Sequence, residues 1–293
     1  MNRVVLKAVV CACLVLAGAP VFAAASSSAT LGNVRITLID LDAGDGIAPS
    51  IAFLPGPQYI GGPYVSGDVH SFVPGEEFGN FERMGSKAGA SISDSAHTAL
   101  ASSAASVTGA ANGAGFGAMS ASGAAQSAIG GAGRYQSFAT VPAANAGQGF
   151  VLSANTRVQF SMTGAANASY TLGYNGQSIE GEYASALLTL LVSGADASGA
   201  GDVVDTQQQS AYVYSIIGES APGPDSASWS GLLSASYSNL SAQSSLGHFY
   251  AEANVAGLSV SAVPEPDTVA MLLAGLGLVG AIARHRRRRH GAI

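Results

Sequence analysis

The feature that most constrains the fold is a regular alternation of large apolar and polar side chains along the chain. Residues 33–40 place Val34, Ile36 and Leu38 on one face of an extended segment, and residues 156–163 repeat the pattern. Successive side chains of a strand point to opposite faces, whereas an amphipathic helix needs a period near 3.6 residues. No helical period separates these segments, so the sequence predicts an all-β fold, an antiparallel β-sandwich or jelly roll.

The same alternation recurs through the second half of the chain. Turn residues such as Asp45-Gly46 and Asn175-Gly176 separate the alternating segments. The further predicted strands are residues 168–174, 182–192, 210–217, 226–237 and 247–260.

Residues 86–148 are rich in Ala, Gly and Ser and admit two interpretations. The composition is typical of a flexible linker. The alternation of small apolar and polar residues nevertheless continues, and Ile129, Tyr135 and Phe138 resume it with larger side chains. We therefore favour strands with small side chains, in a register that such side chains specify poorly.

The first 23 residues have the pattern of a secretory signal peptide. Arg3 and Lys7 precede an uncharged run over residues 8–19, and small residues follow at the exit. This order predicts export and removal of residues 1–23, with cleavage after Ala25 as an alternative. The exported part is therefore residues 24–262 with a C-terminal tail.

Cleavage of the signal peptide also removes both cysteines, Cys11 and Cys13. The mature chain then has no cysteine, which excludes disulfides, thiol catalysis and Cys-ligated metal sites. Residues 24–262 hold five basic and sixteen acidic residues, a formal charge of −11. A body this acidic repels phosphate backbones, so the sequence predicts no nucleic-acid partner.

The C-terminal tail, residues 263–293, combines an apolar run with a basic end. Thr268 to Ala283 carry no charge and would form a helix of about 24 Å, a marginal membrane span. The arginines that follow predict a stop-transfer signal that stays in the cytoplasm with the body outside. These arginines are Arg284, Arg286, Arg287, Arg288 and Arg289. A nucleic-acid patch, a core helix and a plain single-pass anchor are the alternatives.

A proline-acid-proline step precedes this run, at Val263-Pro264-Glu265-Pro266. Two prolines keep the backbone extended and unable to join a helix or sheet, which suits presentation to a protease. A stiff juxtamembrane linker would share this property. With the short Leu- and Gly-containing run and the terminal arginines, the tail resembles the PEP-CTERM sorting domain.

The resemblance implies a partner and a destination. PEP-CTERM tails are substrates of an exosortase, a membrane protease-transpeptidase of Gram-negative bacteria that make exopolysaccharide. The precursor would be anchored transiently in the inner membrane and then delivered to the cell surface or extracellular matrix. Two stretches, residues 34–53 and 152–164, are also similar to the β-sandwich ectodomains of such proteins, which implies no reaction.

Three carboxylates, Asp40, Asp42 and Asp45, gather in one short glycine-containing stretch. They are candidate ligands for Ca²⁺, the one cofactor that the sequence suggests. The stretch is not an EF-hand loop, because Asp45 stands where that loop needs its turn glycine. A turn with solvated acids is the favoured interpretation.

No catalytic constellation emerges from the remaining polar residues. His70, His97 and His248 are scattered without metal-ligand spacing, and Ser220 lacks the second glycine of a nucleophile elbow. The acid pairs Glu76–Glu77 and Glu180–Glu182 are typical of a solvated surface. We therefore expect a protein that is not an enzyme.

Four aromatic residues are candidates for a sugar platform: Trp229, Tyr212, Tyr214 and Tyr237. Their strand positions suit a sandwich core equally well, and burial is the favoured interpretation. The sequence thus predicts a non-catalytic surface or matrix protein that associates with exopolysaccharide. A carbohydrate-binding or Ca²⁺-dependent adhesive module is the alternative, and a glycan-active hydrolase or lyase is a third.

Overall fold

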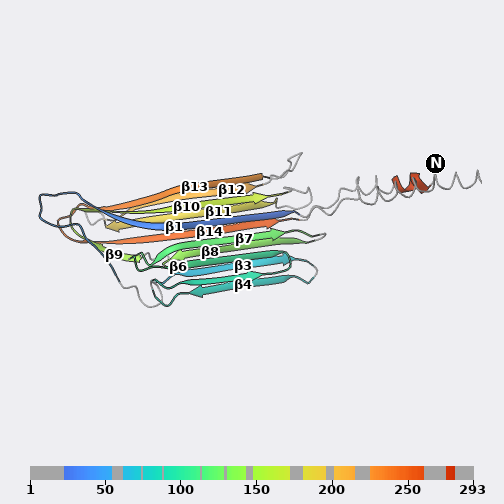
Figure 1. The fold of residues 1–293 in the computed structure, drawn as a ribbon, viewed down its shortest axis with the longest axis horizontal. Coiled ribbons are helices and arrows are strands. Elements are labelled where there is room, and N and C mark those ends of the chain that lie inside the picture. Colours follow the sequence, from blue (N-terminus) through green and yellow to red (C-terminus); the bar gives the residue numbers. More distant parts are fainter. Residues whose placement is uncertain are drawn as a thin grey trace, which may run out of the picture.

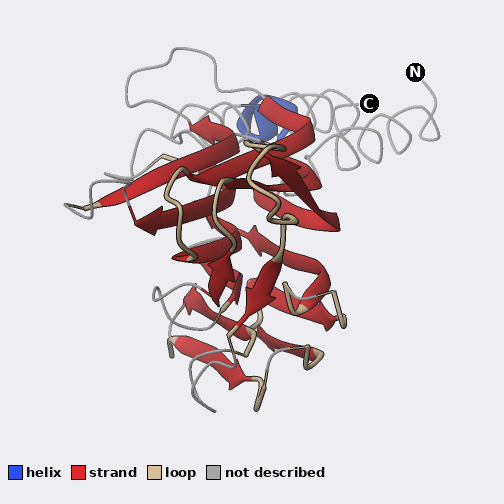
Figure 2. Cartoon of the chain, turned by 90° about the vertical axis from the view of Figure 1, so that its left-hand side faces the viewer, coloured by secondary structure: helices blue, strands red, loops and turns tan. Residues whose placement is uncertain are grey.

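The protein is described from a computed structural model that places residues 23–54, 62–73, 75–87, 89–112, 114–128, 131–142, 148–171, 181–195, 201–214, 225–260 and 275–280. This part of the chain is almost entirely strand, and the strands run along the long axis of the body (Figures 1 and 2). The strands are β1 (Ala24–Asp40), β2 (Ile51–Phe53), β3 (Tyr64–Phe72), β4 (Glu77–Met84), β5 (Ile92–His97), β6 (Ala101–Gly109), β7 (Phe116–Gln126), β8 (Ala132–Val141), β9 (Gln148–Leu152), β10 (Thr156–Tyr170), β11 (Tyr183–Ala195), β12 (Asp202–Tyr214), β13 (Asp225–Asn239) and β14 (Ser245–Ser259).

The strands form two antiparallel sheets that pack face to face. One has six strands in the order β13-β10-β1-β7-β6-β5, and the other runs β12-β11-β14-β8-β3-β4 with β9 and β2 attached beside β14. The sheets lie strand over strand in the same order, from β13 over β12 at one edge to β5 over β4 at the other. This sandwich-like, all-β arrangement agrees with the fold class predicted from the alternation.

Strand β1 is longer than its predicted segment, residues 33–40, because a bulge hides its first half from the pattern. The pairing of β1 with β10 shifts between Gly32 and Arg35, and Asn33 has a φ of 55°. The extra residue changes which side chains face the core, from Leu31 before the bulge to Val34 after it. A strict period of two therefore fails across residues 24–40.

Residues 156–163 and 168–174 were predicted as separate strands, but β10 runs without a break from Thr156 to Tyr170. The gap between the two predicted segments, residues 164–167, begins at Gly164, which lies in the strand under the side chains of Leu188, Leu233 and Leu31. A Cβ added there would lie 2.8 Å from Cδ1 of Leu188. The glycine thus marks a close approach of the facing sheet rather than a turn.

The described residues of the Ala-, Gly- and Ser-rich region form strands β5 to β8. Their inward positions hold small side chains such as Ala105 and Ala121, both almost fully buried. Small side chains leave room for the rings of the opposite sheet. In β5 to β7, the composition that is typical of a linker is therefore that of a sheet with small side chains, packed against aromatic residues such as Tyr135 of β8.

The centre of the core is a group of phenylalanine rings from both sheets. Phe160 and Phe249 stack with ring centroids 5.0 Å apart, and Phe116 lies parallel to Phe249 at 6.1 Å. Phe150 contacts Phe160 at 5.8 Å. Aromatic contacts of this kind add to the stabilisation from burying the rings, so this group ties the two sheets together.

Tyr135 fills the space beneath the small residues of β7. Its ring lies so close to Gly123 of the facing sheet that an added Cβ would be 2.0 Å from Cδ2. Its hydroxyl bonds to Ser27 Oγ at 2.7 Å. Burial raises the pKa of the Tyr135 phenol, so the hydroxyl stays neutral inside the core.

Replacing Gly123 by alanine is expected to lower the free energy of unfolding by about 1–3 kcal/mol, because the new methyl group overlaps the Tyr135 ring. Gly201→Ala is the matched control, since a Cβ there meets nothing within 4 Å. The control should stay within about 0.5 kcal/mol. Urea unfolding of both variants measures the difference, and equal midpoints would contradict this packing.

Charged side chains cover backbone groups at the edges of the sandwich. At one edge, Asp205 Oδ2 of β12 accepts the amide hydrogen bond of Ser236 in β13 at 2.8 Å. At the other, Glu77 Oε2 accepts the amide of Ala99 at 2.7 Å. Each contact satisfies one backbone amide, of β13 in the first case and of the turn between β5 and β6 in the second, so these two acids have a structural role.

Candidate functional site

The predicted sorting residues, Val263, Pro264, Glu265 and Pro266, lie outside the described residues, as do the arginines from Arg284 to Arg289. Residues 275–280, within the predicted membrane helix, are helical and exposed (Figure 1). Among the described residues, no helix has the length and hydropathy needed to cross a membrane.

The three carboxylates proposed for Ca²⁺ lie at the end of β1, which Asp40 closes, and in the turn that follows it, which holds Asp42 and Asp45. Each accepts a hydrogen bond from the backbone amide two residues further along, at 3.0, 3.1 and 2.7 Å for Asp40, Asp42 and Asp45. Asp45 also accepts a hydrogen bond from the side-chain amide of Asn155 at 2.8 Å. The bonds from Asn155 and the Ile47 amide lower the pKa of the Asp45 carboxyl. All three carboxylates thus stabilise the turn itself.

These turn contacts engage oxygens that a cation would need. Within the described ranges, no three His, Cys, Asp or Glu side chains are grouped in a way that could hold a metal ion. Calcium binding by Asp40, Asp42 and Asp45 stays a prediction, which a Ca²⁺ titration can decide.

The residues considered for catalysis are spread over the fold. His70, His97 and His248 belong to β3, β5 and β14 respectively. His70 lies 4.1 Å from the ring of Phe72, measured between centroids. Glu182 is buried and accepts a hydrogen bond from Ser259 at 2.9 Å. Glu180 and Ser220 lie outside the described residues.

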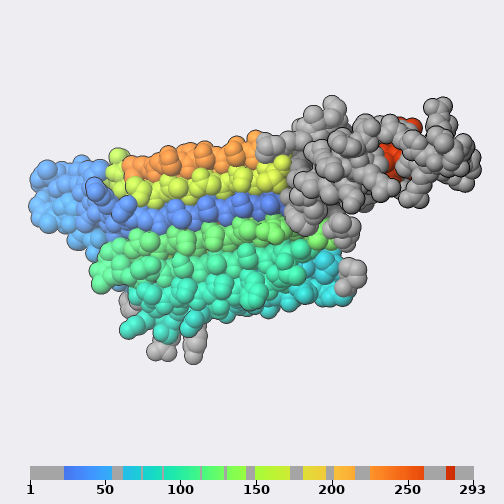
Figure 3. Space-filling view, turned by 45° about the vertical axis from the view of Figure 1, so that its right-hand side comes forward, coloured from blue at the N-terminus to red at the C-terminus, as the bar shows by residue number. Residues whose placement is uncertain are grey.

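Small, uncharged side chains cover much of the outer face of the six-stranded sheet, whose strands are the parallel stripes in Figure 3. The exposed side chains of Arg35 and Arg157 also lie on this outer face, so we use the name serine face for the three rows of residues given below. The register of the strands aligns its residues in rows across the sheet, and serine dominates them. Three adjacent rows are Ser226, Ser169, Ser26, Ala124, Ser102 and His97; Ser228, Asn167, Ser28, Ser122, Ala104 and Ser95; and Ser230, Ala165, Thr30, Ser120, Ser106 and Ser93.

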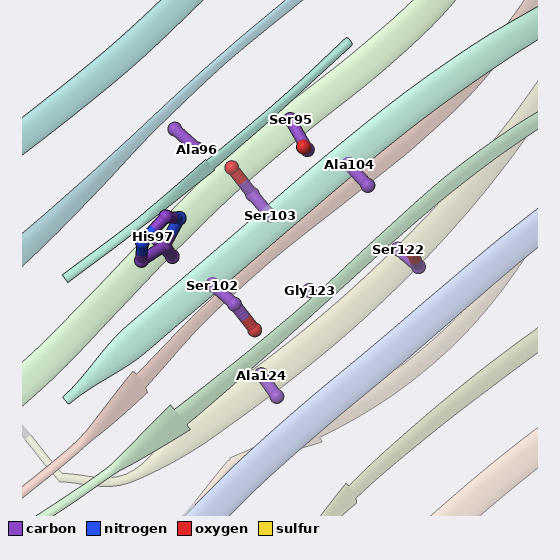
Figure 4. A pocket seen from close by; sticks show the side chains of 9 residues that line it. All are labelled: Ser95, Ala96, His97, Ser102, Ser103, Ala104, Ser122, Gly123 and Ala124. Carbon is purple, nitrogen blue, oxygen red and sulfur yellow. The ribbon is translucent and has the colours of Figure 1, made fainter. Parts of the chain in front are cut away.

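Shallow hollows occur on this serine face. One lies over β5, β6 and β7, with His97, Ser102 and Ser122 among its lining residues (Figure 4). Hydroxyls on the face bond to one another, as Ser106 Oγ does with Ser120 Oγ at 2.8 Å and Ser26 Oγ with Ser169 Oγ at 3.0 Å. The serine face is thus a neutral, hydroxyl-rich surface with shallow hollows on an acidic body.

The outer face of the eight-stranded sheet has a different chemistry, because aromatic and charged residues alternate with small ones. The Tyr64 hydroxyl donates to Glu82 Oε1 at 2.9 Å, and Tyr250 donates to Glu252 in the same way. Burial raises the pKa of the Tyr250 phenol, and the hydrogen bond to Glu252 raises it further. Asn254 donates to the other oxygen of Glu252 at 2.9 Å.

The four aromatic candidates for a sugar platform divide between core and surface. Tyr237 is buried, and its hydroxyl donates to the Ala195 carbonyl at 2.8 Å. Trp229 is half-buried against the core. Tyr212 and Tyr214 were expected to be buried too, but their exposed fractions are 57% and 42%. Burial was therefore the wrong expectation for these two residues, because their strand, β12, points them outward.

Tyr183 joins these two residues in a group that we call the tyrosine cluster: Tyr183, Tyr212 and Tyr214. The rings of Tyr212 and Tyr214 have centroids 6.2 Å apart and planes within 12° of parallel. Tyr183 of β11 is the direct cross-strand partner of Tyr214. Partial burial and the neighbouring phenols of Tyr214 and Tyr183 raise the pKa of the Tyr212 phenol. Sequence reasoning missed Tyr183, and only a correct pairing of β11 with β12 would have found it.

Comparison with known proteins identifies one part of the chain. The family model of the PEP-CTERM protein-sorting motif matches residues 262–288. No curated protein matches the chain. A matching solved structure belongs to work on carbohydrate-binding modules of the β-sandwich superfamily with promiscuous specificity. It is 8% identical, covers 73% of this chain and 97% of its own, and has a TM-score of 0.13.

Proposed function

Because residues 262–288 are a PEP-CTERM protein-sorting motif, we propose that this chain is an exported, non-catalytic surface or extracellular-matrix protein. An exosortase sorts it through that tail. The match to the tail is the observation that carries the proposal. In this proposal a β-sandwich or jelly-roll ectodomain lies between a signal helix, residues 1–23, and a transmembrane helix, residues 268–283.

The physical properties of the tail support a temporary anchor. The uncharged run from Thr268 to Ala283 is short for a bilayer and contains several glycines, which makes a weak permanent anchor. The arginines hold the end of the chain in the cytoplasm while the body is outside. Cleavage near the proline-acid-proline step would then release the ectodomain to the surface or matrix.

The surface of the ectodomain supports a role in the matrix. Its serine face is neutral and rich in hydroxyl groups, like an uncharged polysaccharide. Association with exopolysaccharide is therefore part of the proposal. A carbohydrate-binding module is the second candidate, favoured by the exposed rings of Tyr212 and Tyr214. A hydrolase or lyase is the third, and turnover of the host's own polysaccharide would identify it.

Intact-mass analysis of the protein released by its native host tests the sorting proposal. We expect a species that lacks residues 1–23 and residues 268–293, since processing must remove the arginine cluster with the helix. The membrane fraction of the same cells should contain the longer precursor. A surface form that still carries residues 268–293 would replace the sorting proposal with a plain membrane anchor.

A further inference from the structure

We propose that the tyrosine cluster on the outer face of the eight-stranded sheet binds a neutral glycan, with the rings of Tyr212 and Tyr214 stacking on its pyranose units. The inference rests on the proposed association with exopolysaccharide and names the place where that contact is made. This glycan site differs from the sorting tail in location and chemistry, because the tyrosine cluster belongs to the folded body.

The exposure of the Tyr212 and Tyr214 rings is the first observation that supports a binding site. Other large aromatic side chains, such as Tyr135 and Phe160, lie in the core, where burial of the ring stabilises the fold. Tyr212 and Tyr214 instead leave much of their ring area in water, two residues apart on one strand. Adjacent exposed rings on a rigid strand are typical of a binding surface, because they bury large areas at low entropic cost.

The geometry of the rings favours a glycan over a cation. An aromatic cage for an ammonium group surrounds the charge with ring faces that converge on it. The rings of Tyr212 and Tyr214 are within 12° of parallel with centroids 6.2 Å apart, so they do not converge. The rings are stacked side by side, and the apolar ring area that they leave exposed is complementary to the C–H face of a sugar unit.

The surroundings of the cluster suit a flat, extended ligand. The residues directly across the sheet from Tyr212 are Ser185 and then Ala256, and both have small side chains that do not cover the tyrosine rings. Gln208 lies four residues before Tyr212 on the same strand and face, and its amide donates to Thr189 at 3.3 Å. Hydroxyl and amide groups of this kind bind sugar hydroxyls beside a stacking platform.

The distribution of charge on the protein favours a neutral glycan over an acidic one. Strand β11 (Tyr183–Ala195) has no charged residue, and neither do residues 206–214 of β12. The body as a whole carries a formal charge of −11, which repels acidic polysaccharides. A neutral chain is therefore the ligand that meets no electrostatic penalty at the tyrosine cluster.

Native affinity electrophoresis of the mature protein from its host tests the proposal, in gels that contain the neutral polymers hydroxyethyl cellulose, dextran or galactomannan, or the host's own neutral extracellular polysaccharide. We expect retardation in at least one neutral gel and none in alginate. The double variant Tyr212→Ala/Tyr214→Ala should raise the apparent Kd at least about tenfold. Tyr212→Phe should bind like the wild type, because stacking needs the ring and not the hydroxyl.

Phe78→Ala is the matched control, since Phe78 is 64% exposed on β4 at the opposite edge of the same sheet. It removes an exposed ring without touching the tyrosine cluster and should leave binding unchanged. Circular dichroism and sedimentation velocity of each variant report the fold and the oligomeric state.

Each contrary outcome overturns the inference. If the wild type is retarded by no neutral polymer, the glycan site is wrong while the sorting proposal still stands on its mass test. If the double variant is retarded like the wild type, polysaccharide association stands but the site lies elsewhere. Calorimetric binding of choline chloride that the double variant loses would indicate a cation site. A change in sedimentation caused by the double variant would indicate contact between copies of the chain.

Discussion

Replacing Glu265 by alanine is expected to leave the protein in the membrane fraction as an unprocessed precursor. Glu265 is the acid between Pro264 and Pro266, and the proline rings favour the extended backbone that a protease binds. A hydrogen bond to a charged group is worth about 1.5–3 kcal/mol, so processing should fall by about tenfold or more. Immunoblots of membrane and released fractions measure the ratio of the two forms.

Asp267→Ala is the control for this experiment. It removes a second acid one residue beyond the proline-acid-proline step. If the enzyme recognises the step itself, this variant should be released in the normal amount. Normal release of Glu265→Ala would show that the segment acts only as a stiff linker.

Phe160→Ala is expected to cost about 3–5 kcal/mol of the free energy of unfolding, because it opens a cavity at the centre of the core. The Phe160 ring is fully buried and contacts Phe249 at 5.0 Å, Phe150 at 5.8 Å and Phe53 at 6.4 Å. A loss of this size is a large fraction of the stability of an ordinary domain. Thermal and urea unfolding, followed by circular dichroism, measure it.

Leu232→Ala is the matched control for the core variant. Leu232 lies on β13, which pairs with the strand that carries Phe160, but 65% of its surface is exposed. Its replacement should change the free energy of unfolding by no more than about 0.5 kcal/mol. Similar losses for the two variants would contradict the assignment of the phenylalanine group as the centre of the core.

The alternation of side chains predicted the fold class because it depends only on the local geometry of a strand. Strands β11, β13 and β14 follow the predicted segments closely. The prediction was wrong where one residue changed the phase or the size of the side chains. The bulge at Asn33 shifted the pattern within β1, and the small residues 164–167 left a gap between two predicted segments that are one strand, β10.

The candidate site was harder to predict, because exposure depends on pairing between strands that are distant in sequence. Tyr212 and Tyr237 occupy equally alternating segments, yet one lies on the surface and the other in the core. Which face of a strand is buried depends on the sheet that covers it, and a shift of one residue would exchange the two faces. The tyrosine cluster exists only because β11 and β12 pair in the observed register.

The sequence by itself determined the C-terminal sorting motif and the all-β class of the body. The motif depends on contiguous residues, Pro264 to Pro266 and the apolar and basic runs behind them, and the class depends on a period of two. Only the tertiary structure decided that a neutral serine face and an aromatic face lie on opposite sides of the sandwich. Those faces arise from long-range pairing, such as Ser28 of β1 with Ser122 of β7, whose free energy is not encoded in any local segment.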